Sequence, residues 1–281
     1  MLLWKDTHTL LGLDRNPFAG HPMHAVDFMN YRVVTSEVER FRPDVIINCA
    51  ALTNVDHCED DPRAAMALNG DFVHHLAELS ARQNSVLVQI STDAVFNGRS
   101  ATPYTEEDQA DPINAYARSK LAGEAAALNW RRALVLRTNI FGWNRARPKP
   151  SFGEWLYDVI ANRKPATLFT DVVFSPIYIG RFIELIEVAL QKNLSGLFHL
   201  AGDDSLSKDA FARLLSRRLG RDDDNLKAGS VADVQLRARR ARYMGLSSHK
   251  FATASGSTIP NVKLSIEEFV SERDGPFISI Q

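Results

Sequence analysis

Short apolar runs alternate with segments of helical spacing along the first 200 residues of the chain. The runs rich in Leu, Ile and Val, each short enough for a strand, are 9–15, 44–51, 85–90, 133–137 and 196–202, with a weaker one at 24–27. Apolar residues recur every three or four positions in the intervening segments 34–41, 62–83 and 116–127. Strands that alternate with helices predict an α/β fold with a doubly wound, parallel, Rossmann-like sheet.

The pattern changes after Gly142, where a basic, proline-broken loop begins. Helices are predicted at 152–161, 179–191 and 265–272, with extended chain over 167–179 and a further helix that opens within 205–209. Either Ser205 or Ser207 can cap that helix. We therefore predict two parts: residues 1–142 with 179–202 form the Rossmann-like domain, and 143–178 with 203–281 form a smaller α/β lobe.

Composition and charge narrow the function classes. The 281 residues carry a net charge of −1, so no overall field favours nucleic acid or an anionic membrane. No run of about 18 apolar residues predicts a membrane helix, and the apolar run at the N-terminus is too short for a signal peptide. Cys49 and Cys58 are expected to be free thiols in a reducing, cytoplasmic setting. The histidines show no metal-ligand spacing, so no metal is predicted.

The candidate chemistry lies between residues 91 and 120. Thr92 follows the strand 85–90, at the position where open α/β sheets place their ligands. Tyr116 and Lys120 are four residues apart near the start of a predicted helix, so their side chains share one face. A Tyr-x-x-x-Lys pair alone is a weak signal, but together with a hydroxyl at a strand end it is an acid–base arrangement suited to a carbonyl.

Three motifs resemble the extended short-chain dehydrogenase/reductase family, and more narrowly its dTDP-4-dehydrorhamnose reductase branch. They are NCAAxTxVD at 48–56, STDxVFxG at 91–98 and LRTxxxG at 136–142. The resemblance implies reduction of the 4-keto group of a nucleotide-linked deoxysugar by NADPH or NADH, in surface polysaccharide synthesis. It makes the first domain NAD(P)-binding and the lobe substrate-binding, and it leaves a homodimer open.

The resemblance also implies roles for individual side chains. Tyr116 would donate its phenolic proton to the ketone oxygen, and Thr92 would donate a hydrogen bond to the same oxygen. Lys120 would lower the phenol pKa from about 10 and bind the nicotinamide ribose. Asp93 would hold the substrate sugar.

Further cofactor contacts carry over where the motifs match. Besides Tyr116 and Lys120, they are Asp14, Arg15, Ala50, Ala51, Thr53, Thr138 and Asn139. Asp14 at its strand end suits a ribose diol, whereas the neighbouring Arg15 suits a 2′-phosphate, so the pair leaves NADH and NADPH both open.

Substrate contacts are expected in the second lobe. Trp155 and Ser175 lie in the segments 151–155 and 174–178, which resemble the substrate side of the family. Arg145, Lys149 or the run 237–242 would neutralise a diphosphate. An arginine run is also typical of a solvated helix face.

Two departures from the family pattern leave other functions open. Ala94 stands where the family carries an aromatic residue, and no Gly-x-x-Gly-x-x-Gly turn precedes Asp14. We therefore expect residues 1–281 to lack a central strand and its phosphate-binding turn, and the loss of that strand to expose unpaired sheet edges. A shortened reading frame, a replacement strand, or a non-catalytic relative would each explain this. The alternatives are a binding or regulatory module, like the regulatory subunit of methionine adenosyltransferase, and a nucleotide-sugar epimerase or dehydratase.

Overall fold

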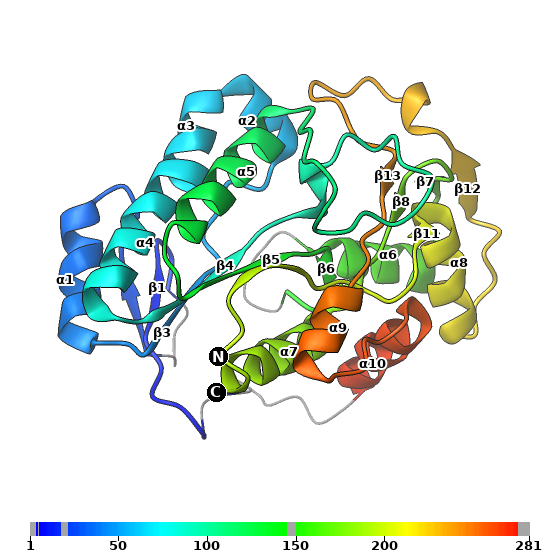
Figure 1. The fold of residues 1–281 in the computed structure, drawn as a ribbon. Coiled ribbons are helices and arrows are strands. Elements are labelled where there is room, and N and C mark those ends of the chain that lie inside the picture. The colour runs from blue at the N-terminus through cyan, green and yellow to red at the C-terminus, as the bar shows by residue number, and fades with distance from the viewer. Residues whose placement is uncertain (1–3, 5, 18–21, 145–149, 275–281) are drawn as a thin grey trace.

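A computed structural model describes residues 4, 6–17, 22–144 and 150–274 of the chain (Figure 1). Its centre is a four-stranded parallel sheet with the order β10-β5-β4-β3. The strands span Val45–Asn48 (β3), Val86–Ile90 (β4), Ala133–Arg137 (β5) and Gly196–His199 (β10). All four lie within runs predicted as strands, and the return of 196–202 to the sheet is confirmed.

Helices cover both faces of this sheet, so the doubly wound architecture is confirmed. Leu87 and Val135 pack with α1 (Tyr31–Phe41), α4 (Phe72–Gln83) and α5 (Ala115–Leu128) on one face. The alternate residues Val88 and Leu134 face the other side, where α7 (Ile179–Gln191) and α9 (His249–Ser255) supply the apolar partners. This alternation follows the period of two residues along a strand.

A separate two-stranded parallel sheet contains β1 (Gly12–Asp14) and β2 (Met23–Ala25). Leu13 of β1 packs in the same cluster as Ile46 of β3, so the two sheets adjoin. Within the described residues no strand pairs with β3 on its outer side or with β1 on the side away from β2. Among the described strands, β1 and β3 therefore do not pair with each other, and each has one unpaired edge.

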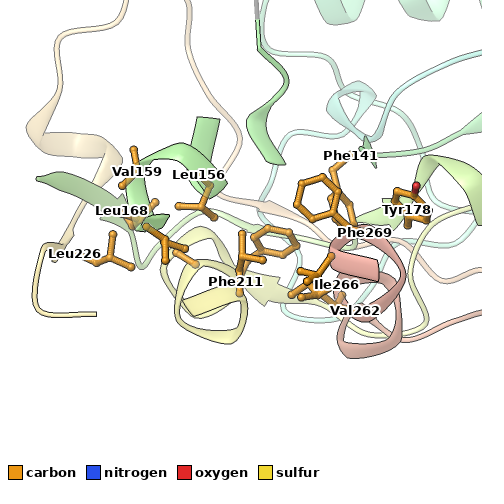
Figure 2. Close-up of a cluster of buried hydrophobic side chains, with 14 of the residues drawn as sticks. Phe141, Leu156, Val159, Leu168, Tyr178, Phe211, Leu226, Val262, Ile266 and Phe269 are labelled. Atoms are coloured by element: carbon orange, nitrogen blue, oxygen red, sulfur yellow. The ribbon is translucent and has the colours of Figure 1, made fainter. Parts of the chain in front are cut away.

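The second lobe has its own apolar core, shown in Figure 2. Phe141, Leu156, Phe211 and Phe269 are fully or almost fully buried there. They come from four separate elements: β6 (Ile140–Phe141), α6 (Phe152–Ala161), α8 (Lys208–Arg218) and α10 (Val262–Asp274). The short strands of this lobe are β7 (Ala166–Phe169), β8 (Val173–Phe174), β9 (Ile177–Tyr178), β11 (Leu206–Ser207), β12 (Leu226–Gly229) and β13 (Tyr243–Met244).

Several elements differ from the sequence expectation. The predicted helix 62–83 is three segments: α3 (Pro62–Met66), a π-helical turn (Ala67–Asp71) and α4. The helix α2 (Val55–Asp60) and the strands β12 and β13 have no counterpart in the prediction. Phe251 of α9 packs against Phe198 of β10, so one helix of the range 203–281 covers the central sheet. The domain boundaries themselves stay a prediction.

Candidate active site

The carboxyl end of β4 holds Thr92 in an extended conformation beside β5. The pairing of the two strands continues past Ile90, because the Ser91 N–H donates to the Leu136 carbonyl at 2.7 Å and the Asp93 N–H to the Thr138 carbonyl at 3.3 Å. The Thr92 hydroxyl accepts a 3.1 Å hydrogen bond from the Ala94 N–H and caps the single 3₁₀ turn 93–95. Capping explains why a small hydroxyl residue stands here.

The start of α5 brings Tyr116 and Lys120 to this strand end. Asn114 caps the helix by accepting from the Ala117 N–H at 2.9 Å, and Glu59 of α2 accepts from the Ala115 N–H at 2.8 Å. The Tyr116 side chain lies near that of Thr92, close enough for Thr92 to lower the pKa of the phenol. The buried Lys120 ammonium donates to the Ile90 carbonyl at 2.6 Å. The structure therefore brings together the three side chains predicted to be catalytic.

Burial dominates the electrostatics of this trio. It raises the pKa of Tyr116 to about 12, the Asp93 carboxylate adds to the rise, and the Thr92 side chain opposes it. Burial lowers the pKa of Lys120 to about 8, opposed by Glu124. The phenol pKa thus stands above its ordinary value, the opposite of the lowering expected from Lys120. Tyr116 is consequently protonated at neutral pH, as a proton donor must be.

Asp93 is buried beside Thr92 and uses both carboxylate oxygens. One accepts from the Thr92 hydroxyl at 3.2 Å and the other from the Asn139 amide at 2.6 Å. Burial raises the pKa of Asp93, and these hydrogen bonds with the cation of Lys208 oppose the rise. Asn139 thereby acts on Asp93, a contact that the predicted nicotinamide role did not anticipate.

Asn69 joins the loop after β3 to α5 from within the π-helical turn. Its amide oxygen accepts from the Leu52 N–H at 2.8 Å, and its amide nitrogen donates to the Leu52 carbonyl at 3.0 Å and to Ser119 at 2.9 Å. A π-turn redirects one side chain out of the regular helical register, and such turns are frequent at functional sites. This buried residue fixes the loop that carries Ala50 and Ala51 against the helix that carries Tyr116 and Lys120.

A buried ion pair between β5 and α5 supports the site. Arg137 at the end of β5 binds Glu124 of α5 through two nitrogens, the shortest contact being 2.7 Å. Ser91 donates to the same carboxylate. This network ties the ends of β4 and β5 to α5, and so fixes the spacing between Thr92 and Tyr116.

The predicted cofactor residues lie at the same edge of the fold. Ala50, Thr53 and Thr138 follow the carboxyl ends of the parallel strands β3 and β5, and Leu13, next to Asp14, packs in the same cluster as Ala50. Asp14 accepts from the Asn16 N–H at 2.8 Å, and Arg15 is exposed. Their contacts with a cofactor stay a prediction.

A nicotinamide ribose suits the residues of β4, β5 and α5. The Thr138 hydroxyl is buried without a hydrogen-bond partner among the described residues, and the Lys120 ammonium has donors beyond the one that Ile90 accepts.

The substrate-side predictions have mixed placements. Trp155 of α6 is 38% exposed and stacks on Phe152. Ser175 is fully buried, with its hydroxyl 2.7 Å from that of Ser205 and accepting from the Leu246 N–H. This placement favours a structural role for Ser175, and both substrate contacts stay predictions.

The arginine run is mostly paired. Arg237 bonds Asp60, and Arg240 bonds Asp56 at 2.9 Å, so the loop 237–242 is docked on α2. The guanidinium of Arg242 lies 3.7 Å from Asp171. These three cations are committed to carboxylates, which weakens the prediction that they neutralise a diphosphate. Arg145 and Lys149 lie outside the described residues.

Both cysteines are free, as predicted. Across the part of the chain that the structure describes, no group of three or more His, Cys, Asp or Glu residues is arranged to hold a metal ion. The helices of that part include none with the length and apolarity to cross a membrane.

The doubly wound sheet and the Tyr–Lys pair define the class of Rossmann-like NAD(P)-dependent oxidoreductases. Residues 2–274 match the RmlD substrate binding domain family, and the chain belongs to it. It is 32% identical over 269 residues to the probable low-salt glycan biosynthesis reductase Agl14 of Haloferax volcanii, covering 93% of this chain and 89% of that protein. It is 30% identical to the dTDP-4-keto-6-deoxy-D-glucose reductase of Streptomyces niveus, covering 85% of this chain and 83% of that one.

Solved structures show the same architecture. A dTDP-4-dehydrorhamnose reductase from Bacillus anthracis, in complex with NADP, superposes with a TM-score of 0.82 at 26% identity. The match covers 88% of this chain and 87% of that one. A hypothetical dTDP-4-dehydrorhamnose reductase from Sulfolobus tokodaii gives a TM-score of 0.80 at 28% identity, covering 90% and 88%.

Proposed function

We propose that this chain is an NAD(P)H-dependent reductase of the 4-keto group of a dTDP-linked deoxysugar, acting in surface polysaccharide synthesis. The observation that carries the proposal is the convergence of Thr92, Tyr116 and Lys120 at the carboxyl end of β4, where the Lys120 ammonium donates to the Ile90 carbonyl at 2.6 Å. The names of the relatives from Haloferax volcanii and Streptomyces niveus support a reductase of a nucleotide-sugar ketone.

The chain's own groups position and protonate the ketone. The Thr92 hydroxyl turns its one proton from Asp93 to the ketone oxygen, so that Thr92 and Tyr116 both donate to that oxygen. Tyr116 transfers its proton as charge develops there. Asp93 accepts hydrogen bonds from hydroxyl groups of the sugar, since a carboxylate has more acceptor positions than Thr92 and Asn139 occupy. Lys120 binds the ribose of the dinucleotide, and the bound dinucleotide supplies the hydride.

The test follows the absorbance of reduced nicotinamide when the protein is mixed with NADPH or NADH and dTDP-4-keto-6-deoxy sugar. Wild type is expected to oxidise the cofactor, and Tyr116→Phe is expected to lose at least about 100-fold in kcat/KM. Tyr157→Phe on α6, whose ring meets Trp143 edge to face, is the matched control and is expected to retain activity. Turnover that persists in Tyr116→Phe would overturn the assigned proton donor.

The same experiment separates the alternative functions. Absence of turnover together with a stable complex with another protein would favour the binding module. An NAD cofactor retained through purification would favour an epimerase or dehydratase. The proposal also includes a cytoplasmic location and a homodimer, and light scattering on the purified chain tests the dimer.

A further inference from the structure

Lys208 is the least expected side chain near the candidate active site. It is the first residue of α8, directly after the capping Ser207. The partial positive charge at a helix N-terminus disfavours a cation there. Acidic residues suit the first turn of a helix, and the next residue, Asp209, is one of them.

The ammonium of the half-buried Lys208 also lies against aromatic rings. It lies 3.2 Å from the centroid of the Phe174 ring and 4.3 Å from that of Phe152, so two aromatic faces hold it. Among the described residues these ring contacts are the only ones that its ammonium makes, with no ion pair or hydrogen bond. Burial accordingly lowers the pKa of Lys208, and the negative field of Asp93 opposes that change.

Asp93 connects Lys208 to the reacting groups. The interaction is reciprocal, because the Lys208 cation lowers the pKa of Asp93 and the Asp93 carboxylate raises the pKa of Lys208. Asp93 also raises the pKa of Tyr116. The two charges face each other without direct contact, each with donor or acceptor capacity left over. A ligand with adjacent hydroxyl groups can accept from one and donate to the other.

We propose that Lys208 is a substrate-binding residue that donates hydrogen bonds to hydroxyl groups of the sugar ring, opposite the acceptor Asp93. The aromatic rings of Phe152 and Phe174 hold the ammonium in place, so little side-chain entropy is lost when the sugar binds. This inference rests on the proposed function for the identity of the sugar nucleotide. Lys208 would add a contact from the second lobe that binds the sugar ring and leaves the nucleotide untouched.

The test compares two ligands by titration calorimetry, the product sugar nucleotide dTDP-rhamnose and dTDP alone. In Lys208→Met, which keeps the length and removes the charge, dTDP-rhamnose is expected to bind about 10-fold to 100-fold more weakly, the usual range for hydrogen bonds from a charged group. Binding of dTDP is expected to stay within about twofold. Lys208→Gln, which keeps a donor, is expected to lose less.

Lys250→Met is the matched control, because this ammonium also lies over an aromatic ring, 5.0 Å from the centroid of Phe198, on α9. Melting temperatures show whether each variant is folded. If Lys208→Met is not folded, the two ligands are compared in Lys208→Gln instead. Equal losses for the two ligands, or no loss, would overturn the role of Lys208 alone. Wild type that binds dTDP-rhamnose but never oxidises NADPH would overturn the proposed function while the comparison still decides on Lys208. Wild type that binds neither ligand would overturn both.

Discussion

The Lys120 ammonium is held 2.6 Å from the backbone carbonyl of Ile90, the last residue of β4. This contact spans from α5 to the strand end that carries Thr92. It therefore couples the position of the cation to the backbone of the reacting site. The two further N–H donors of an ammonium remain for a ribose.

Lys120→Met is expected to lower kcat/KM by about 100-fold or more, because it removes both the ribose donor and the anchor at Ile90. NADPH binding, followed by fluorescence titration, is expected to weaken in parallel. Lys192→Met, at the exposed end of α7, is the control and is expected to behave as wild type. Unchanged NADPH affinity in Lys120→Met would contradict the ribose contact.

Asn69→Ala is expected to destabilise the fold and to impair the site together. It removes the three hydrogen bonds of a buried side chain, each worth about 1 kcal/mol net, so a loss of roughly 2–4 kcal/mol is expected in urea unfolding. The loop at Leu52 then loses its attachment to α5, and kcat/KM is expected to fall more than for a remote variant of equal stability. Asn162→Ala on the exposed end of α6 serves as the control, with a change near zero.

The fold was largely predictable because its strands are buried on both faces. The runs 85–90 and 133–137 are mainly apolar, and this pattern has few alternatives in a chain with helical spacing between them. The trio of Thr92, Tyr116 and Lys120 was predictable for a related reason, since one strand end and one helical turn place all three.

Residues whose roles depend on distant partners were not predictable. Asn69 lies in a segment with ordinary helical spacing, and only the π-turn directs its amide to Leu52 and Ser119. Lys208 acquires its character from Phe152, Phe174 and Asp93, which lie far from it in the sequence. The arginine run has a local pattern typical of a solvated face, whereas its carboxylate partners sit on α2 and beside β8. For Lys208 one local signal was available, because a cation in the first turn of a helix is opposed by the helix dipole.

The buried ion pair of Glu124 and Arg137 predicts that removing one charge costs more stability than removing both. Glu124→Gln leaves the buried Arg137 cation without its counter-charge and is expected to cost about 3–5 kcal/mol. The double variant Glu124→Leu with Arg137→Met removes both charges and is expected to be more stable than Glu124→Gln. The exposed pair of Arg163 and Asp222 is the comparison, where Asp222→Asn is expected to change stability by less than about 0.5 kcal/mol. Equal costs at both pairs would contradict this assignment.

His199 at the end of β10 predicts how stability depends on pH. The ring is fully buried, with Nδ1 3.1 Å from the Tyr104 carbonyl, and burial with the nearby Arg137 cation lowers its pKa to about 3. In the unfolded chain an imidazole titrates near 6.5. Between these values the unfolded state binds a proton that the folded state excludes. The stabilising contribution of neutral His199 is therefore complete above about pH 6.5 and is lost as the pH falls towards 3, at up to about 1.4 kcal/mol per pH unit.

Removing this imidazole is expected to flatten the acid limb of the stability curve. Urea unfolding of His199→Asn between pH 6.5 and 4.5 should show a weaker loss than wild type, because asparagine keeps a donor for the Tyr104 carbonyl but takes up no proton. His74→Asn on the exposed face of α4 is expected to follow the wild-type slope. A parallel slope in His199→Asn would mean that the carboxylates alone set the acid limb, and that His199 takes up its proton equally in both states.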